Sequence, residues 1–168
     1  MAKTIDYKST DPDPDTKVKI ISNTHSKIYW IQLNSRPINL LRIGTPASLS
    51  YLELENMAYT SDLIQTGDVY VADKNVFEAL QLQNVKYEDI KLSSELKKML
   101  SLSSEELKEE MQKLPEGNKE LLAELALANY SDLKGSVIDV IEEETNIKVT
   151  LVKEDEKANK ENQKKNTK

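Results

Sequence analysis

The spacing of apolar side chains changes partway along this chain, and the first part has the period of β-strands. In TKVKIIS (16–22) valine and isoleucine alternate with two lysines, so one face of the segment is apolar and the other is polar. KIYWIQL (27–33) and INLLRI (38–43) are β-branched and aromatic runs, and the turn-forming stretches NTHS and NSRP separate the three segments. Three short strands joined by short polar turns predict an antiparallel meander.

The period then becomes helical. PASLSYLELENMAYTSDLIQTG begins with a proline, offers Ser48 or Ser50 as a helix cap, and places Gly67 where a helix would end. DVYVA returns to the strand period, and Asp73 can cap a short helix in KNVFEAL. These elements predict a β-β-β-α-β-α module over residues 16–82.

From about residue 92 the sequence predicts helices. The expected helices begin at polar caps, namely Ser94, the capping box of Ser103 with Glu106, and Asn118. A last helix is expected near residues 132–145, and IKVTLV (147–152) has the β-branched composition of a short terminal strand. Helices this short need to pack on one another, so this part of the chain predicts a small helical bundle.

The two ends of the chain differ from its middle. Residues 1–15 finish in DPDPD, where each proline disfavours helix in the residue before it and the aspartates repel one another, so we expect an extended arm. Residues 153–168 contain no large apolar side chain and predict a disordered, charged tail. Between them lie a β-rich module (16–82) and a helical module that ends in a short strand (83–152). The predicted fold class is α+β, with an N-terminal antiparallel β meander with short helices followed by a C-terminal helical bundle.

Composition narrows the classes of function. The chain has 168 residues, enough for one domain or two small modules, and its net charge of −6 argues against direct binding to nucleic acid, whose phosphates favour a basic face. The absence of cysteine excludes disulfides and thiolate chemistry. No run approaches the ~18 apolar residues of a membrane span, and the polar start MAKTIDYKSTDPDPD lacks the apolar region of a secretory signal.

The residue types that carry catalysis are scarce. His25 is the only histidine, and it lies between Thr24 and Ser26 in a predicted polar turn, where exposure to solvent is the expected state. The four glycines are scattered as turns and stops, so no phosphate-binding glycine loop is possible, and no common catalytic motif occurs. The sequence therefore predicts a protein that is not an enzyme, with no catalytic residue, no cofactor and no metal ligand.

Candidate interface residues gather around the second and third predicted strands. Trp30 is the only tryptophan, in a run with apolar residues on both faces, so it is either a core residue or an anchor for a partner. Arg36 and Arg42 lie in the turn and strand that follow, where they are either surface charges or part of the same contact. We take Tyr29, Trp30, Arg36 and Arg42 as the candidate protein-interface residues.

The chain also resembles a known group of proteins in its layout. The segments IISNTH, GTPASLSYLELENM, GDVYVADKNVFEALQL, SSEEL, LPEGNKELLAELAL and EEETNI follow one another over roughly residues 20–148. In this layout the chain is similar to small virion-associated proteins of tailed bacteriophages. The resemblance implies a capsid-auxiliary, vertex or connector component without catalytic residues, and it carries no functional residue over to this sequence.

Two functions follow as expectations. The first is a non-enzymatic, multi-copy structural component of a phage virion, made in the host cytoplasm and assembled by contacts with other virion proteins (capsid, portal or neighbouring copies) rather than with a membrane or nucleic acid. The alternative is a small cytoplasmic adaptor or regulatory protein that binds a partner through its helical module.

Overall fold

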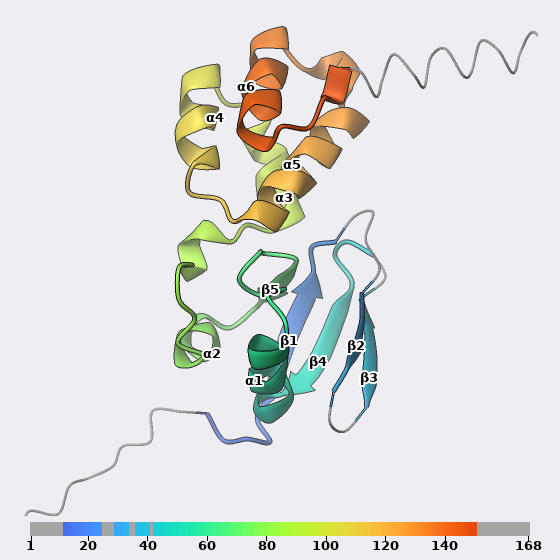
Figure 1. Cartoon of the computed structure of the whole chain (residues 1–168), viewed down its shortest axis with the longest axis vertical. Helices are drawn as coiled ribbons and strands as arrows, with labels where there is room; N and C mark the ends of the chain where they lie inside the picture. The colour runs from blue at the N-terminus through green and yellow to red at the C-terminus, as the bar shows by residue number, and fades with distance from the viewer. Residues whose placement is uncertain (1–11, 25–28, 34–35, 41, 151–168) are drawn as a thin grey trace, which may run out of the picture.

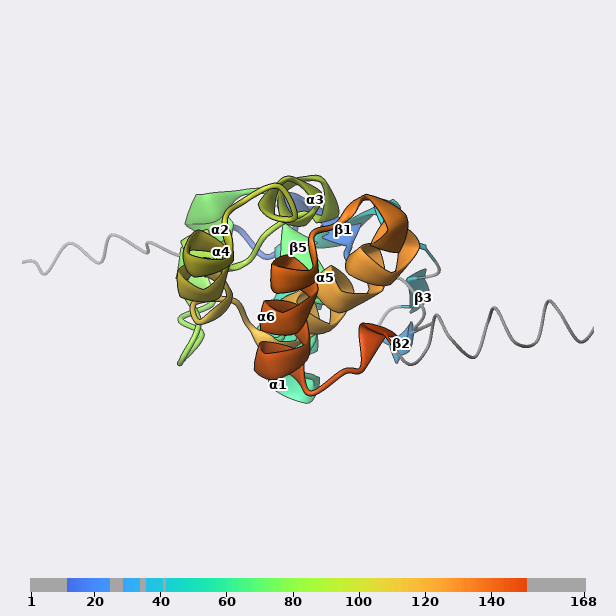
Figure 2. The same cartoon turned by 90° about the horizontal axis from the view of Figure 1, so that it is seen from above.

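The structure is a computed structural model that describes residues 12–24, 29–33, 36–40 and 42–150. Its strands and first two helices form one body, and α3 to α6 form a second body stacked on it along the long axis (Figure 1). Seen from above, the four helices lie over the strands (Figure 2). This confirms the α+β class, with an N-terminal antiparallel sheet and short helices followed by packed C-terminal helices. No helix in the described part of the chain is long and apolar enough to cross a membrane.

The central strand of the N-terminal sheet is β1 (Lys17–Ser22). It pairs antiparallel with β4 (Pro46–Ser50) on one side and with β5 (Val69–Val71) on the other. Val18 and Ile20 are buried while the lysines between them are exposed, as the alternation of apolar and polar residues predicted.

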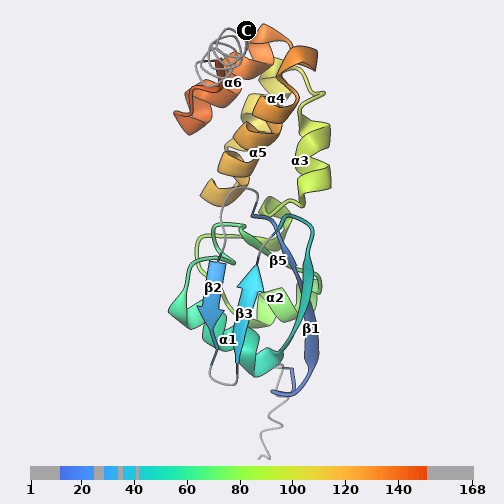
Figure 3. The same ribbon diagram turned by 90° about the vertical axis from the view of Figure 1, so that its right-hand side faces the viewer.

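The predicted meander is confirmed in the antiparallel pairing of its second and third strands and wrong in the pairing of its first with its second. Among the described strands, β2 (Tyr29–Gln32) pairs with β3 (Pro37–Leu40) and with no other, as a separate ribbon (Figure 3). The neighbour of β1 is β4 instead, which comes from the segment predicted to be the start of a helix. In β4, Ala47 and the fully buried Leu49 face inward between serines, and a serine-rich stretch is equally compatible with a helix cap and an edge strand.

Helix α1 (Tyr51–Thr60) begins at a predicted cap. The Ser50 hydroxyl accepts a hydrogen bond from the Glu53 N–H (3.2 Å), and the Glu53 carboxylate accepts one from the Ser50 N–H (2.8 Å), which together form a capping box. The helix ends at Thr60 rather than at Gly67, because Ser61 takes an extended conformation with φ −147°. The chain then turns so that two consecutive apolar residues, Leu63 and Ile64, are both buried.

The short helix α2 (Lys74–Ala79) starts at Asp73, whose carboxylate accepts the N–H groups of the first turn, as predicted. Its Phe77 meets Tyr87, from the 3₁₀ helix η1 (Tyr87–Asp89), edge to face at 5.4 Å between ring centroids. Burial and a hydrogen bond with the Tyr70 hydroxyl (2.7 Å) raise the pKa of Tyr87 above its ordinary value. The first apolar cluster therefore extends along the chain to Ile90, beyond residue 82, where the β-rich module was predicted to end.

The second apolar cluster is made by four helices and the connection η2 (Tyr130–Asp132). The helices are α3 (Ser93–Met99), α4 (Ser104–Met111), α5 (Glu116–Ala128) and α6 (Gly135–Thr145). The capping box of Ser103 with Glu106 is confirmed, whereas the cap predicted at Ser94 is wrong. There the cap position is Leu92, two residues before Ser94, and the Glu95 carboxylate accepts a hydrogen bond from the Leu92 N–H (2.8 Å).

The strand predicted over residues 147–152 is wrong in its described part. Asn146 has φ 57°, a left-handed conformation that ends α6, and Val149 and Thr150 then begin another helical turn. Val149 is buried in the helical cluster, and the Thr150 N–H donates to the Glu142 carboxylate (2.8 Å). The segment therefore returns to α6 and not to the sheet.

This return contact should be sensitive to acid. The Thr150 N–H, with Lys148 at 3.3 Å, holds the pKa of the Glu142 carboxyl below its ordinary value of 4.5. A lowered folded-state pKa stabilises the protein above the ordinary pKa, and this stabilisation is lost as the pH falls through the folded-state value. We expect Glu142→Gln to lower the free energy of unfolding at about pH 6 and to have little effect at about pH 3, by chemical denaturation at both pH values.

The matched control is Glu144→Gln on the same helix, since the Glu144 carboxylate makes no hydrogen bond or ion pair in the described part of the chain. This variant should keep the pH dependence of the parent protein. Equal loss of stability for Glu142→Gln at both pH values would show that the carboxylate charge is not what holds the terminal turn.

The two modules meet where the loop at Gly67 touches the start of α5. Asn118 is fully buried there; its Oδ1 accepts the Lys91 N–H (2.6 Å) and its Nδ2 donates to the Gly67 carbonyl (3.2 Å). The buried Asn23 donates from its own Nδ2 to the same carbonyl (3.1 Å) and to the Lys91 carbonyl (2.9 Å). The helix cap predicted at Asn118 is therefore wrong, because Pro115 holds the cap position and the asparagine joins three separate segments.

Helix α5 has no side-chain cap of its own. The carboxylate of the buried Asp68 lies beside Gly117 in its first turn, where the helix dipole favours a negative charge. The sheet module thus adds a second negative charge to that of Glu116 at the N-terminus of this helix.

Candidate functional site

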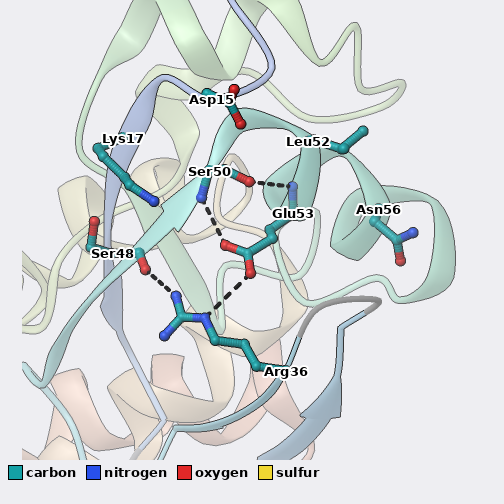
Figure 4. Close-up of a pocket in the computed structure, with 8 residues that line it drawn as sticks. All are labelled: Asp15, Lys17, Arg36, Ser48, Ser50, Leu52, Glu53 and Asn56. Atoms are coloured by element: carbon teal, nitrogen blue, oxygen red, sulfur yellow. Dashed lines mark hydrogen bonds and ion pairs between the residues drawn. The ribbon is translucent and has the colours of Figure 1, made fainter.

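The largest of the grooves described here runs along β4 and has a volume of about 600 Å³. β1, β4 and the first two turns of α1 supply most of its side chains (Figure 4). It is lined by Asp15, Lys17, Arg36, Ser48, Ser50, Leu52, Glu53 and Asn56. We refer to it as the β4 groove.

Inside this groove, an arginine and a glutamate form hydrogen bonds with backbone groups of β4. The Arg36 guanidinium donates to the Ser48 carbonyl (2.7 Å) and to the Glu53 carboxylate (3.3 Å), and the same carboxylate accepts the Ser50 N–H (Figure 4). β4 also begins with Pro46, which has no N–H. Charged side chains and proline are common ways of blocking an exposed strand edge. The Arg36–Glu53 pair therefore covers the outer edge of β4.

The pair should contribute little to stability. Arg36 is 52% exposed, and exposed ion pairs contribute about 1 kcal/mol or less. We expect Arg36→Met to lower the free energy of unfolding by less than about 1 kcal/mol, and Arg42→Met, whose side chain has no partner in the described part of the chain, to leave it unchanged. Thermal and urea denaturation of both variants test this, and a loss above about 2 kcal/mol for Arg36→Met would contradict it.

The α1 wall of the β4 groove carries an exposed apolar residue. Leu52 is 56% exposed, and Tyr59, seven positions later on the same face of the helix, is 83% exposed. Between them lie Glu55 and Asn56, so this outward face of α1 separates the β4 groove from a second groove of about 340 Å³. Neither Leu52 nor Tyr59 was predicted from the sequence to be a site residue. The signal was present, because Leu52 lies about 200° around the helix from the buried Leu54.

The charges of the β4 groove are balanced but not all paired. Two acidic and two basic side chains line it, and Arg36 is bound to Glu53. Within the described residues, the Asp15 carboxylate and the Lys17 ammonium have no side-chain partner. Figure 4 shows Lys17 pointing toward Ser50, its cross-strand neighbour. The groove therefore offers one cation, one anion and one apolar side chain to a ligand.

The four residues predicted from the sequence fall on or next to the β2–β3 ribbon. Tyr29 and Trp30 lie in β2, opposite Leu40 and Asn39, and their side chains are outside the described part of the structure. Arg36 precedes β3 and reaches the β4 groove, whereas Arg42 is exposed beyond the other end of β3. The two arginines thus do not share a site. His25 lies outside the described residues.

A third groove, of about 410 Å³, lies on the helical module. Met99 and Leu102 are its apolar lining, and five charged side chains complete it, namely Lys91, Glu95, Glu106, Glu109 and Glu110. Three of these carboxylates already have partners: Glu95 and Glu106 cap helices, and Glu110 pairs with Lys113. Glu109 has none in the described part of the chain. We refer to this as the acidic groove.

Comparison of the chain with protein-family models, with curated proteins and with solved structures finds no match. Within the described residues no group of three or more histidine, cysteine, aspartate and glutamate side chains is placed to hold a metal ion. The shifted carboxyl pKa values come from surface ion pairs and caps; Lys74, for example, lowers the pKa of Glu88. The β4 groove and the acidic groove are therefore considered as binding surfaces.

Proposed function

We propose that this protein is a non-enzymatic structural component of a tailed-phage particle, a capsid-auxiliary, vertex or connector protein that acts by protein–protein contacts of its β module. The observation that carries the proposal is the β4 groove with its exposed Leu52. An exposed leucine beside a long open groove, with charged side chains lacking partners at its rim, has the composition of a protein-binding surface. The resemblance of the sequence layout to small virion proteins supports other virion proteins as the partners.

Mass spectrometry of purified particles tests this proposal. Particles of the phage whose genome carries this sequence should contain the chain in a fixed ratio to the major capsid or portal protein. Its absence from particles that are otherwise complete would refute the virion function.

The interface within the β module can be tested by assembly. Arg36→Ala and Arg42→Ala should keep the fold, because both side chains are exposed. If the β2–β3 ribbon makes the contact, at least one of them should reduce incorporation into particles. Trp30→Ala separates the two roles left open for this residue: a folded protein that fails to assemble indicates an anchor, and an unfolded protein indicates a core residue.

A second candidate is a small cytoplasmic adaptor or regulatory protein that binds its partner through the helical module. The acidic groove favours it, because an apolar floor with acidic rims suits a basic amphipathic helix. A synthetic amphipathic peptide of lysine and leucine should then bind the protein and bind Glu109→Lys more weakly, and the chain should be missing from particles. Asp139→Lys, at an exposed position of α6 outside the groove, is the matched charge reversal and should bind the peptide normally.

A further inference from the structure

The second groove, of about 340 Å³, lies between the outer face of α1 and the loop that follows α2. Its α1 wall carries Tyr59, whose side chain is 83% exposed, and Glu55. Four side-chain amides also line it, those of Gln65, Gln81, Gln83 and Asn84. We refer to it as the amide groove.

The loop LQLQN (80–84) presents three of these amides because its apolar and polar residues alternate. Its two leucines pack against the first apolar cluster, whereas Gln81, Gln83 and Asn84 are exposed. Within the described residues, none of the four amides of the groove makes a side-chain hydrogen bond. Each amide has two N–H donors and a carbonyl acceptor. The groove therefore offers both kinds of hydrogen-bonding group to a ligand.

Two of the amides belong to residues with a left-handed backbone. Gln81 has φ 50° and Asn84 has φ 67°. Gln81 directly follows Leu80, the C-cap of α2, and glycine is the usual residue at this position because it has no Cβ. Residues held in such conformations cluster at ligand-binding sites. A binding role for its amide gives a reason for glutamine at a position that favours glycine.

The lining of the amide groove selects against charged ligands. Among the described residues that line it, Glu55 is the only charged one, so a phosphate or carboxylate group would meet no cation. Neutral hydroxyl groups both donate and accept hydrogen bonds, as the amides do. The exposed Tyr59 ring has a partially negative face, on which the polarised C–H bonds of a sugar ring can stack. A flat aromatic ring beside neutral hydrogen-bonding groups suits a carbohydrate.

We propose that the amide groove binds a neutral saccharide, with the Tyr59 ring against one face of a sugar and the amides of Gln81 and Asn84 hydrogen-bonded to its hydroxyl groups. Ligand pockets have volumes of about 300–1,000 Å³, so this groove suits a short saccharide or the end of a longer one. The amide groove shares no lining residue with the β4 groove. Saccharide binding here does not depend on the proposed function.

NMR titration of the full, ¹⁵N-labelled chain tests the proposal, with maltotriose, mannotriose and triacetylchitotriose as neutral probes. At least one of them should shift the side-chain amide signals of Gln81 and Asn84, with a dissociation constant of about 1 mM. The absence of such shifts with every probe at about 20 mM overturns the proposal. The uncharged peptide acetyl-Leu-Gln-Leu-amide is the competing probe. If it shifts these signals and the saccharides do not, the groove binds peptides and the proposal is wrong.

Variants of Tyr59 test the stacking contact. Tyr59→Leu keeps an apolar side chain but removes the ring, so it should weaken saccharide binding by about tenfold or more. Tyr59→Phe keeps the ring and should bind within about threefold of the parent protein. Both variants should fold normally, because this side chain is exposed. Equal affinities of the two variants would show that the ring does not make the contact.

Gln81→Gly separates binding from folding. It removes the amide but suits the left-handed backbone, so it should keep or raise the midpoint of thermal unfolding while weakening binding by about fivefold or more. Asn146→Gly is the matched control, since Asn146 also has a left-handed backbone (φ 57°) but ends α6, outside the groove. This control should keep or raise the midpoint in the same way and bind the saccharide with the affinity of the parent protein. Undiminished binding by Gln81→Gly would contradict the proposal.

Discussion

Gly117→Ala should lower the free energy of unfolding by about 3 kcal/mol. A Cβ atom at this position in the first turn of α5 would lie 2.7 Å from the Thr66 carbonyl oxygen and 3.0 Å from the Asp68 carboxylate. The carbonyl belongs to the backbone and cannot rotate away, so the helix and the Gly67 loop must move apart. Chemical denaturation followed by circular dichroism measures the effect.

Two other glycines serve as controls for this prediction. Gly135 begins α6, and a Cβ there meets nothing within 4 Å. We expect Gly135→Ala to leave stability unchanged or to raise it by up to about 1 kcal/mol, since alanine has fewer unfolded conformations. A Cβ at Gly44 also meets nothing within 4 Å, but this residue has φ +77°. Gly44→Ala should therefore lower the free energy of unfolding by only about 1–2 kcal/mol, the cost of a left-handed backbone for alanine. Equal losses at Gly117 and Gly135 would show that the junction is loosely packed.

The second large effect is expected at Asn118. Asn118→Leu keeps the branched outline of the side chain but removes its amide, so the Lys91 N–H loses its partner, whereas the Gly67 carbonyl keeps the hydrogen bond from Asn23. A buried polar group without a partner costs about 1–3 kcal/mol, and we expect the free energy of unfolding from urea denaturation curves to fall by about 3 kcal/mol. Both modules should be destabilised together, because the Asn118 amide joins the Gly67 loop, the linking segment at Lys91 and helix α5.

Asn129→Leu is the matched control. The Asn129 amide also donates one hydrogen bond, to the Leu125 carbonyl (2.7 Å), but this bond is local and partly exposed. Water can replace it, so the loss should stay within about 1 kcal/mol. If Asn118→Leu loses no more than this control, the junction admits water and the asparagine does not hold the modules together.

These junction variants and the groove variants address different parts of the molecule. Gly117 and Asn118 contact the Gly67 loop, whereas the β4 groove is lined from β1, β4 and α1. Leu52→Gln should therefore leave stability unchanged, because its side chain is already exposed in the folded protein.

The candidate site was predicted only in part. Arg36 was identified from its position after a strand, but its partners Glu53 and Ser48 come from a helix and a strand that the sequence pattern merged into one helix. Leu52 was not among the predicted interface residues, which were taken only from the second and third predicted strands and the turn between them. Its outward position followed from the helical period alone and needed no tertiary information.

The sequence by itself determined the local elements of this protein. Ser50, Asp73 and the box of Ser103 with Glu106 begin helices as predicted, since a cap bonds to backbone two or three residues away. The alternation in β1 likewise needs only its own residues and a core on one side. Only the tertiary structure decided that β1 pairs with β4, and that Asn118 binds Lys91 and Gly67 instead of capping α5. Such partners lie far along the chain, and a hydrogen-bonding side chain takes whichever buried group the packing of both modules brings to it.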